Sequence, residues 1–309
     1  MNDKIRNQLE NLRQNNVSGA SELIESALNI IELQLTLIHS NKKDIKEDIF
    51  ELSKEIINSR PSMAPLINTI GFLVHDTLII TKELIRERID VYKKDKIERF
   101  MMHEKNFRNF FRAWGKDKYS IMLISFSSTI NNLLLKNTDL NLEFYILESR
   151  PLLEGRRVAE ILSDYFKVNL IVDAASGKFL DQVDLVLIGV DSILEDGSVV
   201  NKIGTYPLAV IAKTKKIHVF AVGDSFKYNL RSHYGQNVLI EKKSSKEIYD
   251  RAPKRNFEIH NYYFDITPSE YIDGIISDLG ILSIQAFIER IKDYLPIKWF
   301  KYFINDEGF

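Results

Sequence analysis

The chain has 309 residues and a mass of 35.9 kDa, which corresponds to one large domain or two ordinary ones. Its 42 Lys and Arg residues nearly balance its 43 Asp and Glu residues, which argues against function through bulk attraction to nucleic acid or to anionic membranes. The absence of cysteine excludes disulfides, thiolate metal sites and a cysteine nucleophile. No apolar run is long enough to span a membrane, and the first residues are polar with mixed charge, so we expect a cytoplasmic protein.

Residues 1–116 show the apolar spacing of consecutive amphipathic helices. Ile5, Leu9 and Leu12 open the pattern at helical intervals. Further helices are predicted over 23–38, over 44–58, from 63 onward and over 77–111. The helix over 44–58 is expected to stop at Arg60-Pro61, because proline disfavours helical backbone in the residue before it. The small and charged residues from Gly115 to Lys118 interrupt the pattern, so we place a domain boundary there.

Residues 117–309 alternate short apolar runs with amphipathic segments. The runs are rich in β-branched and aromatic residues and lie at 121–127, 142–147, 168–174, 184–190 and 218–222, with helices expected between them, including 154–166 and 203–213. Continuous apolar strands separated by helices are typical of a parallel sheet covered on both faces. The predicted fold class is therefore α/β, with a helical N-terminal domain followed by a Rossmann-like, doubly wound parallel-sheet domain. Such sheets bind ligands beyond the carboxyl ends of their strands.

Common cofactor and metal motifs are absent from the sequence. No GxGxxG or GxxxxGK[ST] loop follows a predicted strand, which argues against a dinucleotide site and a P-loop. No HExxH or similar spacing occurs, and the histidines are scattered. We therefore expect neither a cofactor nor a metal.

Three groups of polar residues lie at predicted strand ends. The SFSST segment, 125–129, offers hydroxyls and free N–H groups to an anion, although the same residues could simply cap a helix. Residues 148–156 place two arginines and two carboxylates around a strand-to-helix turn, either as a binding site or as a salt-bridged helix start. Asp191 ends a buried strand, and Asn201-Lys202 is expected at a helix start. The carboxylate and the ammonium could meet one small polar ligand.

Three sequence blocks occur in a specific order and spacing. They are ESRPLLEGRR at 148–157, GVDSILEDGSVVNKIGTY at 189–206 and FDITPSEYI at 264–272. Together they resemble the family that unites the alpha, beta and delta regulatory subunits of eukaryotic translation initiation factor 2B with ribose-1,5-bisphosphate isomerase and 5-methylthioribose-1-phosphate isomerase. The likeness extends upstream to Gly19-Ala20 and Arg60-Pro61. The resemblance implies a helical N-terminal domain on a Rossmann-like domain, in agreement with the periodicity.

Two residues separate this chain from the isomerases that it resembles. Those enzymes use a cysteine after the first strand of the α/β domain and an aspartate in a G-[AV]-D turn; here Asp191 stands at the aspartate position and Ser125 at the cysteine position. A serine hydroxyl is far less acidic than a thiol of pKa ~8.5, so it does not readily supply an ionised base. The isomerases also carry an arginine before Gly19-Ala20, at the substrate phosphate, where this chain has Ser18.

The other ligand positions of the family are retained. By resemblance, the ligand-binding residues are Gly19, Ala20, Arg60, Ser127, Ser128, Asn201, Lys202 and Lys227. The segment FDITPSEYIDGIISDLG is especially similar to the beta and delta subunits. These features predict a regulatory-subunit homologue that binds a sugar phosphate or nucleotide without isomerising it. The alternatives are a ribose-1,5-bisphosphate isomerase that works through Asp191, and an assembly subunit in which these cations only support the fold.

The resemblance also implies partners. They are a sugar phosphate or nucleoside monophosphate, further copies of the chain in a dimer or hexamer, and initiation factor 2 or other 2B-type subunits; neither nucleic acid nor a membrane is expected. The C-terminal segment, 287–309, places aromatic residues beside lysines. A basic-aromatic helix could lie on a membrane, but we expect this helical extension to pack on its own domain or on a partner, since aromatic residues are common interface anchors.

Overall fold

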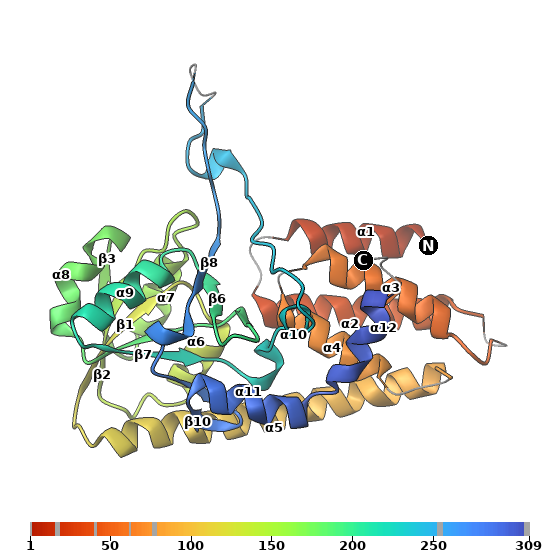
Figure 1. Cartoon of the computed structure of the whole chain (residues 1–309), viewed down its shortest axis with the longest axis horizontal. Coiled ribbons are helices and arrows are strands. Elements are labelled where there is room, and N and C mark those ends of the chain that lie inside the picture. Colours follow the sequence, from red (N-terminus) through yellow and green to blue (C-terminus); the bar gives the residue numbers. More distant parts are fainter. Residues whose placement is uncertain are drawn as a thin grey trace.

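The computed structural model describes residues 2–15, 19–39, 42–61, 63–75, 79–251 and 256–305. A group of helices forms one half of the molecule and an α/β sheet the other, and the long helix α5 (Lys82–Trp114) runs beneath both (Figure 1). This arrangement confirms the predicted fold class.

The helical half contains the helices expected from the apolar spacing. They are α1 (Asp3–Gln14), α2 (Ala20–Leu37), α3 (Lys46–Ser59), α4 (Ala64–Val74) and the first part of α5. Thr81 caps α5 by accepting a hydrogen bond from the Leu84 amide at 3.2 Å. The predicted start of this helix, at Thr77, lies outside the described residues. Gly115 ends α5 with φ +64°, a left-handed conformation that glycine adopts at little cost, and β1 starts four residues later.

Helix α4 joins the two halves. Almost all of its residues are buried, because it packs on α5 and on the short helix η3 (Ser225–Lys227) of the α/β half. The side-chain amide of Asn68 donates hydrogen bonds to the carbonyls of Phe226 and Tyr228, both at 2.7 Å. The backbone on either side of Lys227 is therefore fixed by the helical half.

The central sheet has seven strands in the order β10-β9-β7-β4-β1-β2-β3. The bounds are β1 (Tyr119–Ile124), β2 (Leu142–Leu147), β3 (Lys167–Ile171), β4 (Leu185–Ile188), β7 (His218–Val222), β9 (Gly274–Ser277) and β10 (Gly280–Leu282). All neighbours pair in parallel except β10, which is antiparallel to β9. The strand order changes direction between β1 and β4, and such switch points are where open α/β sheets bind ligands.

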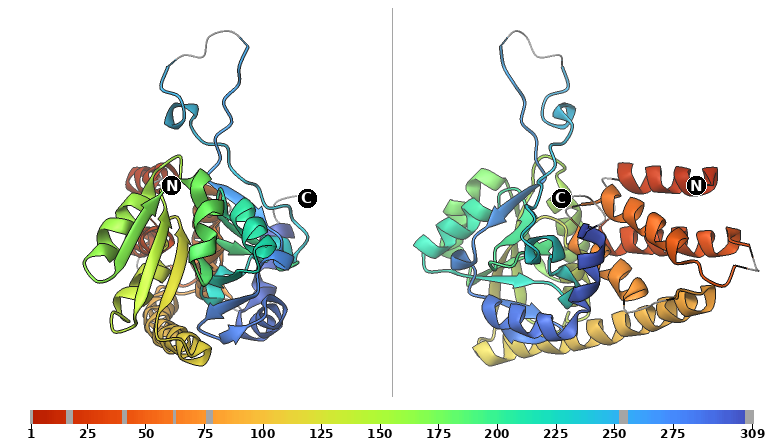
Figure 2. Two further views of the ribbon diagram at one scale, coloured as in Figure 1. Left: turned by 90° about the vertical axis from the view of Figure 1, so that its left-hand side faces the viewer. Right: turned by 45° about the vertical axis from the view of Figure 1, so that its right-hand side comes forward.

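Helices cover both faces of this sheet, as Figure 2 shows end-on. Helix α5 shares one apolar core with α6 (Ser128–Leu135) and α7 (Glu154–Ser163), while α9 (Thr205–Thr214) and α11 (Ile284–Tyr294) share a second core with the helical half. Ile121 and Leu123 of β1 belong to the first core and Met122 to the second, as the alternation of side chains along a strand requires. Two further short α-helices are α8 (Ser176–Phe179) and α10 (Leu230–His233).

A small antiparallel sheet was not predicted. It consists of β5 (Ser192–Ile193), β6 (Val199–Lys202) and β8 (Phe264–Thr267). Asp196-Gly197, a typical hairpin turn, lies between β5 and β6. The expectation that Asn201-Lys202 begins a helix is therefore wrong: both residues lie on β6, and α9 starts at Thr205.

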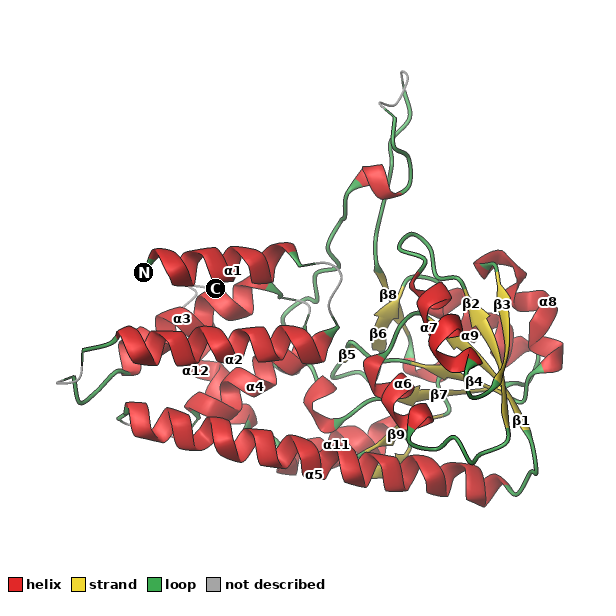
Figure 3. Cartoon of the chain, turned by 180° about the vertical axis from the view of Figure 1, so that it is seen from behind, coloured by secondary structure: helices red, strands yellow, loops and turns green. Residues whose placement is uncertain are grey.

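Two further features depart from the predicted pattern. Residues 236–251 and 256–263 rise away from the body as the two sides of an extended arm, which meet at a bridge between Lys242 and Tyr262 (Figures 1 and 2). The C-terminal extension, η6 (Ile297–Trp299) and α12 (Phe300–Asn305), folds back onto the helical half of the same chain (Figure 3). The rings of Phe303 and Phe50 lie 5.9 Å apart. None of the described helices is both long and apolar enough to cross a bilayer.

Candidate functional site

The loops that follow β1 and β4 meet at the switch point of the sheet. A Cβ atom on Gly189 would lie only 3.0 Å from the Cβ of Ser127 and 3.4 Å from Oδ1 of Asn201. The missing side chain of Gly189 therefore lets these two predicted ligand residues approach each other. Asn201 is oriented by its side-chain amide, which donates to the hydroxyl of Thr205 at 3.0 Å.

Ser125, which the resemblance puts at the position of the isomerase cysteine, is held in an unusual conformation. Its φ is +69°, in the left-handed region that non-glycine residues adopt at a cost of about 1–3 kcal/mol, most often at functional sites. Its amide donates to Oγ of Ser149 at 2.7 Å, and its own hydroxyl donates to Oε1 of Glu154 at 2.8 Å. The turn that begins at Glu148 thus fixes the residue after β1.

Glu154 is a central site residue that the sequence analysis did not assign. Its Oε1 lies 2.7 Å from Nζ of Lys202, whose side chain is only 4% exposed, so the two form a buried ion pair. Its Oε2 is buried and accepts no hydrogen bond among the described residues. A Cβ atom on the next residue, Gly155, would lie 1.8 Å from the carbonyl oxygen of Leu147. Only glycine lets α7 start so close to the end of β2, which brings Glu154 to the site.

Asp191 lies just beyond the end of β4. Burial raises the pKa of its carboxyl, and the nearby ammonium groups of Lys227 and Lys202 oppose that rise. The Asp191 amide donates to the Val200 carbonyl at 2.9 Å, while the side-chain carboxyl forms no hydrogen bond within the described part of the chain. A carboxyl with a raised pKa between two cations is suited to exchange a proton with a bound ligand.

Lys227 reaches the site from η3, the short helix after β7. The residue is buried, and its ammonium has no ion-pair partner among the residues that the structure describes. A Cβ atom on Gly223 would lie 3.0 Å from Cβ of Val190 and 3.4 Å from Cγ of Lys227, so the ends of β4 and β7 are in close contact there. Lys202 and Lys227 therefore approach Asp191 from two different elements.

The remaining predicted residues lie at the border with the helical half. A Cβ atom on Gly19 would be 3.7 Å from Oγ of Ser128, so the start of α2 meets the start of α6, while Ser18 lies outside the described residues. Ser127 caps α6 by accepting from the Ile130 amide at 3.3 Å, the capping role that was one of the two alternatives for the SFSST segment.

Arg60 is placed less centrally than its predicted role implies. Its Nε donates to the carbonyl of Leu12 at 3.0 Å and its Nη2 to the carbonyl of Asn15, so it anchors the end of α1. Burial lowers the pKa of the Arg60 guanidinium, whereas the nearby Glu241 and Tyr263 of the arm raise it. The ring of Tyr263 lies 5.3 Å from Nζ of Lys202 at the switch point.

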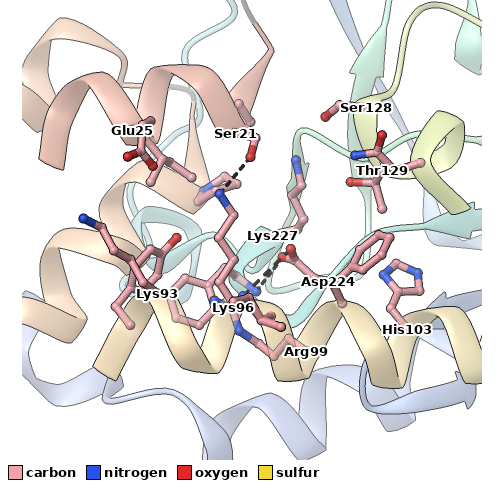
Figure 4. Close-up of a pocket in the computed structure, with 18 of the residues that line it drawn as sticks. Ser21, Glu25, Lys93, Lys96, Arg99, His103, Ser128, Thr129, Asp224 and Lys227 are labelled. Carbon is pink, nitrogen blue, oxygen red and sulfur yellow. Dashed lines mark hydrogen bonds and ion pairs between the residues drawn. The ribbon is translucent and has the colours of Figure 1, made fainter. Parts of the chain in front are cut away.

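A cleft of about 810 Å³ adjoins the switch point on the side of the helical half. Residues of α2, α5, α6 and η3 line it, and Ala20, Ser128 and Lys227 are the predicted ligand residues among them (Figure 4). No group of three or more metal-ligating side chains occurs in the described ranges. The site thus combines two carboxyls, two buried ammonium groups and several hydroxyls, a set suited to a phosphorylated polyol.

Comparison with known proteins identifies the family. The model of the Initiation factor 2 subunit family matches residues 16–284. The chain belongs to this family. Four relatives named ribose 1,5-bisphosphate isomerase are 25–27% identical to it, and the one from Methanocaldococcus jannaschii is 27% identical over 297 residues, 94% of this chain and 96% of its own length.

Solved structures of similar proteins share the fold. The translation initiation factor eIF-2B of Pyrococcus horikoshii OT3 superimposes with a TM-score of 0.77 at 24% identity, covering 92% of this chain and 98% of that one. A chain of the tetrameric eIF2B-beta2-delta2 complex from C. thermophilum gives a TM-score of 0.70 at 14% identity, with 89% and 90% covered.

Proposed function

We propose that this chain is an aldose–ketose isomerase that acts on a phosphorylated pentose, ribose 1,5-bisphosphate. The sequence alone favoured a non-catalytic regulatory subunit, but the relatives that align over almost the whole chain and bear the isomerase name support the alternative. The observation that carries the proposal is the carboxyl of Asp191, with its pKa raised by burial, facing Lys202 and Lys227 at the switch point.

The proposed reaction needs one proton-transferring group beside fixed positive charge. Converting ribose 1,5-bisphosphate to ribulose 1,5-bisphosphate breaks the bond between C1 and the ring oxygen, moves a hydrogen from C2 to C1 and moves the proton of the C2 hydroxyl to the ring oxygen, so no atoms are gained or lost. Asp191 can accept the proton from C2 and return it to C1, because a raised pKa brings a carboxyl closer to neutral pH. Lys202 and Lys227 then stabilise the negative charge that develops on the oxygen at C2.

Ser125 has a different part in this proposal from that of a cysteine base. Because its hydroxyl proton is donated to Glu154, its oxygen lone pairs stay available to accept a hydrogen bond from a sugar hydroxyl. Glu154 brings a second carboxyl within one hydrogen bond of the substrate. We propose that this pair orients the sugar while Asp191 transfers the proton.

The test compares Asp191→Asn with a matched control, Asp164→Asn, at an exposed aspartate that caps the far end of α7. Product formation from ribose 1,5-bisphosphate can be followed by phosphorus NMR. Loss of a general base lowers kcat by roughly 10²–10⁴-fold, so we expect this loss in Asp191→Asn and wild-type rates in the control. Equal rates in all three proteins would refute the role of Asp191.

The second candidate is a regulatory subunit that binds a sugar phosphate or nucleotide without converting it. The observation that favours it is Ser125 at the position of the isomerase cysteine. In that case ribose 1,5-bisphosphate would raise the melting temperature of the protein, since a ligand that binds only the native state stabilises it, but no ribulose 1,5-bisphosphate would form.

We also propose that the chain associates with itself. The support is the likeness of its fold to a chain whose structure is a tetrameric complex. Light scattering at micromolar concentration should give at least twice the 35.9 kDa of one chain. A single species of 35.9 kDa would contradict self-association.

A further inference from the structure

The C-terminal extension closes a second cavity, which neither the predicted site nor the proposed reaction uses. Its volume is about 420 Å³, within the usual range for small-molecule sites, and it lies among α10, the end of α11, η6 and α12. The hydroxyl of Tyr234, directly after α10, donates to the carbonyl of Ile297 at 3.1 Å and fixes the extension against this wall. Most of the lining follows residue 284, where the match to the family model ends, so membership of the family does not account for the cavity.

Basic side chains from four elements line this cavity. They are His233 of α10, Lys292 of α11, Lys298 of η6 and Lys301 of α12. No aspartate or glutamate is among the described residues that line it. Lys298 and Lys301 are exposed, and within the described ranges neither ammonium group has an ion-pair partner. Nζ of Lys301 lies 5.9 Å from the ring centre of Tyr234, which also lines the cavity, so this charge is held at the cavity wall.

One carboxylate outside the lining holds two of these basic groups in place. Glu195, in the turn between β5 and β6, accepts a hydrogen bond from Nζ of Lys292 at 2.8 Å and another from the hydroxyl of Tyr228. Its Oε2 also lies 2.9 Å from Nδ1 of His233. Burial raises the pKa of the Glu195 carboxyl, but these hydrogen bonds outweigh burial and lower the pKa to about 2, so the group is ionised at neutral pH. Because Nδ1 of His233 is engaged, Nε2 is the ring nitrogen that can meet a ligand.

The charges in and beside the cavity do not cancel. Three ammonium groups against the one carboxylate of Glu195 leave two positive charges when the imidazole of His233 is neutral. The lining also includes apolar side chains, such as Leu295, that suit a carbon skeleton. We propose that the cavity binds a small organic dianion, a dicarboxylate or a phosphate monoester, whose charged groups are held by Lys298, Lys301 and His233. This site is separate from the switch point, and the inference does not depend on the proposed isomerase activity.

Trp299 provides a local readout, because it lines the cavity and the only other tryptophan of the chain is Trp114, at the end of α5. The Trp114→Phe protein would be titrated with succinate, with glycerol 3-phosphate and, as an uncharged control, with glycerol, while the fluorescence of Trp299 is followed. Calorimetry on protein that keeps Trp114 repeats the same titrations. We expect at least one of the two anions to bind saturably with a Kd of ~1 mM or lower, and glycerol to have no effect. Which anion binds identifies the charged group that the cavity accepts.

Two double variants separate the cavity from the general charge of the protein. Lys298→Gln/Lys301→Gln changes the cavity, and Lys94→Gln/Lys105→Gln removes the same charge from exposed positions of α5 outside it. Losing a hydrogen bond to a charged group weakens binding roughly ten- to hundredfold, so we expect at least about tenfold weaker binding in the first variant and wild-type binding in the second. The inference is overturned if neither anion binds saturably up to ~10 mM, if the first variant binds like wild type, or if both variants lose affinity equally. None of these outcomes depends on turnover, so they leave the role of Asp191 to its own test.

Discussion

Replacing Lys202 by methionine separates the structural from the binding role of the most buried ion pair in the site. Nζ of Lys202 lies 2.7 Å from Glu154, and the two side chains are 4% and 20% exposed. Methionine fills similar space but, among the described residues, leaves the Glu154 carboxylate with only the hydroxyl of Ser125 as a partner. Breaking a buried ion pair from one side costs 3–5 kcal/mol, and the partial exposure of Glu154 places the expected loss in the free energy of unfolding at about 3 kcal/mol.

The double variant Lys202→Met/Glu154→Gln is the control for this prediction. Because it removes both charges, it should recover about 2 kcal/mol of unfolding free energy relative to Lys202→Met, within the usual range for residues in direct contact. Urea unfolding followed by tryptophan fluorescence measures these differences. Ligand affinity should behave differently: both variants should bind ribose 1,5-bisphosphate about 1.5–3 kcal/mol more weakly than wild type, the scale for a hydrogen bond to a charged group. The arrangement described for Lys202 would be refuted if the double variant were no more stable to unfolding than Lys202→Met. It would also be refuted if both variants bound ribose 1,5-bisphosphate as tightly as wild type.

Three further predictions concern other positions. Gly155→Ala should lower the free energy of unfolding by about 3 kcal/mol or more, since its Cβ would lie 1.8 Å from a backbone oxygen, whereas Gly177→Ala, with 3.8 Å to its nearest neighbour, should change it by less than about 1 kcal/mol. Burial lowers the pKa of His103 to about 4, so the unfolded chain binds a proton more readily and stability is lost as pH falls from about 6.5 to 4. In His103→Gln, the free energy of unfolding should fall by about 3 kcal/mol less than in wild type as the pH is lowered from about 6.5 to 4. Unfolding titrations at these pH values would detect the difference. Because burial raises the pKa of Asp191, kcat/KM should fall on acidification at a pH above the ordinary titration range of aspartate; a fall centred at pH ~3.9 or below would contradict Asp191 as the base.

The sequence predicted the elements whose periodicity is local. Apolar residues at helical spacing, such as Ile5, Leu9 and Leu12, are all buried in the structure. The strands β2, β4 and β7 lie within the predicted apolar runs and β1 overlaps its run, because both faces of the central sheet are covered. In contrast, β6 and β8 are short and belong to a separate small sheet, where their side chains do not form such a run.

Site residues that depend on long-range contacts were harder to predict. Lys202 and Asp191 were assigned through the family resemblance, but Glu154 was not, because its partner Lys202 lies on a strand that the sequence did not reveal. The glycine that follows Glu154 was a usable signal, since glycine at a helix start indicates a close approach of two backbones.

The most direct test of the proposed function is to incubate the wild-type protein with ribose 1,5-bisphosphate in heavy water and to follow the sugar by proton and phosphorus NMR. Proton transfer through the carboxyl of Asp191, which exchanges with solvent, predicts ribulose 1,5-bisphosphate that carries deuterium at C1, formed at ~1 per second or faster, within the usual range for enzymes. If the sugar binds but remains ribose 1,5-bisphosphate, the isomerase proposal is contradicted and the chain is a non-catalytic member of its family.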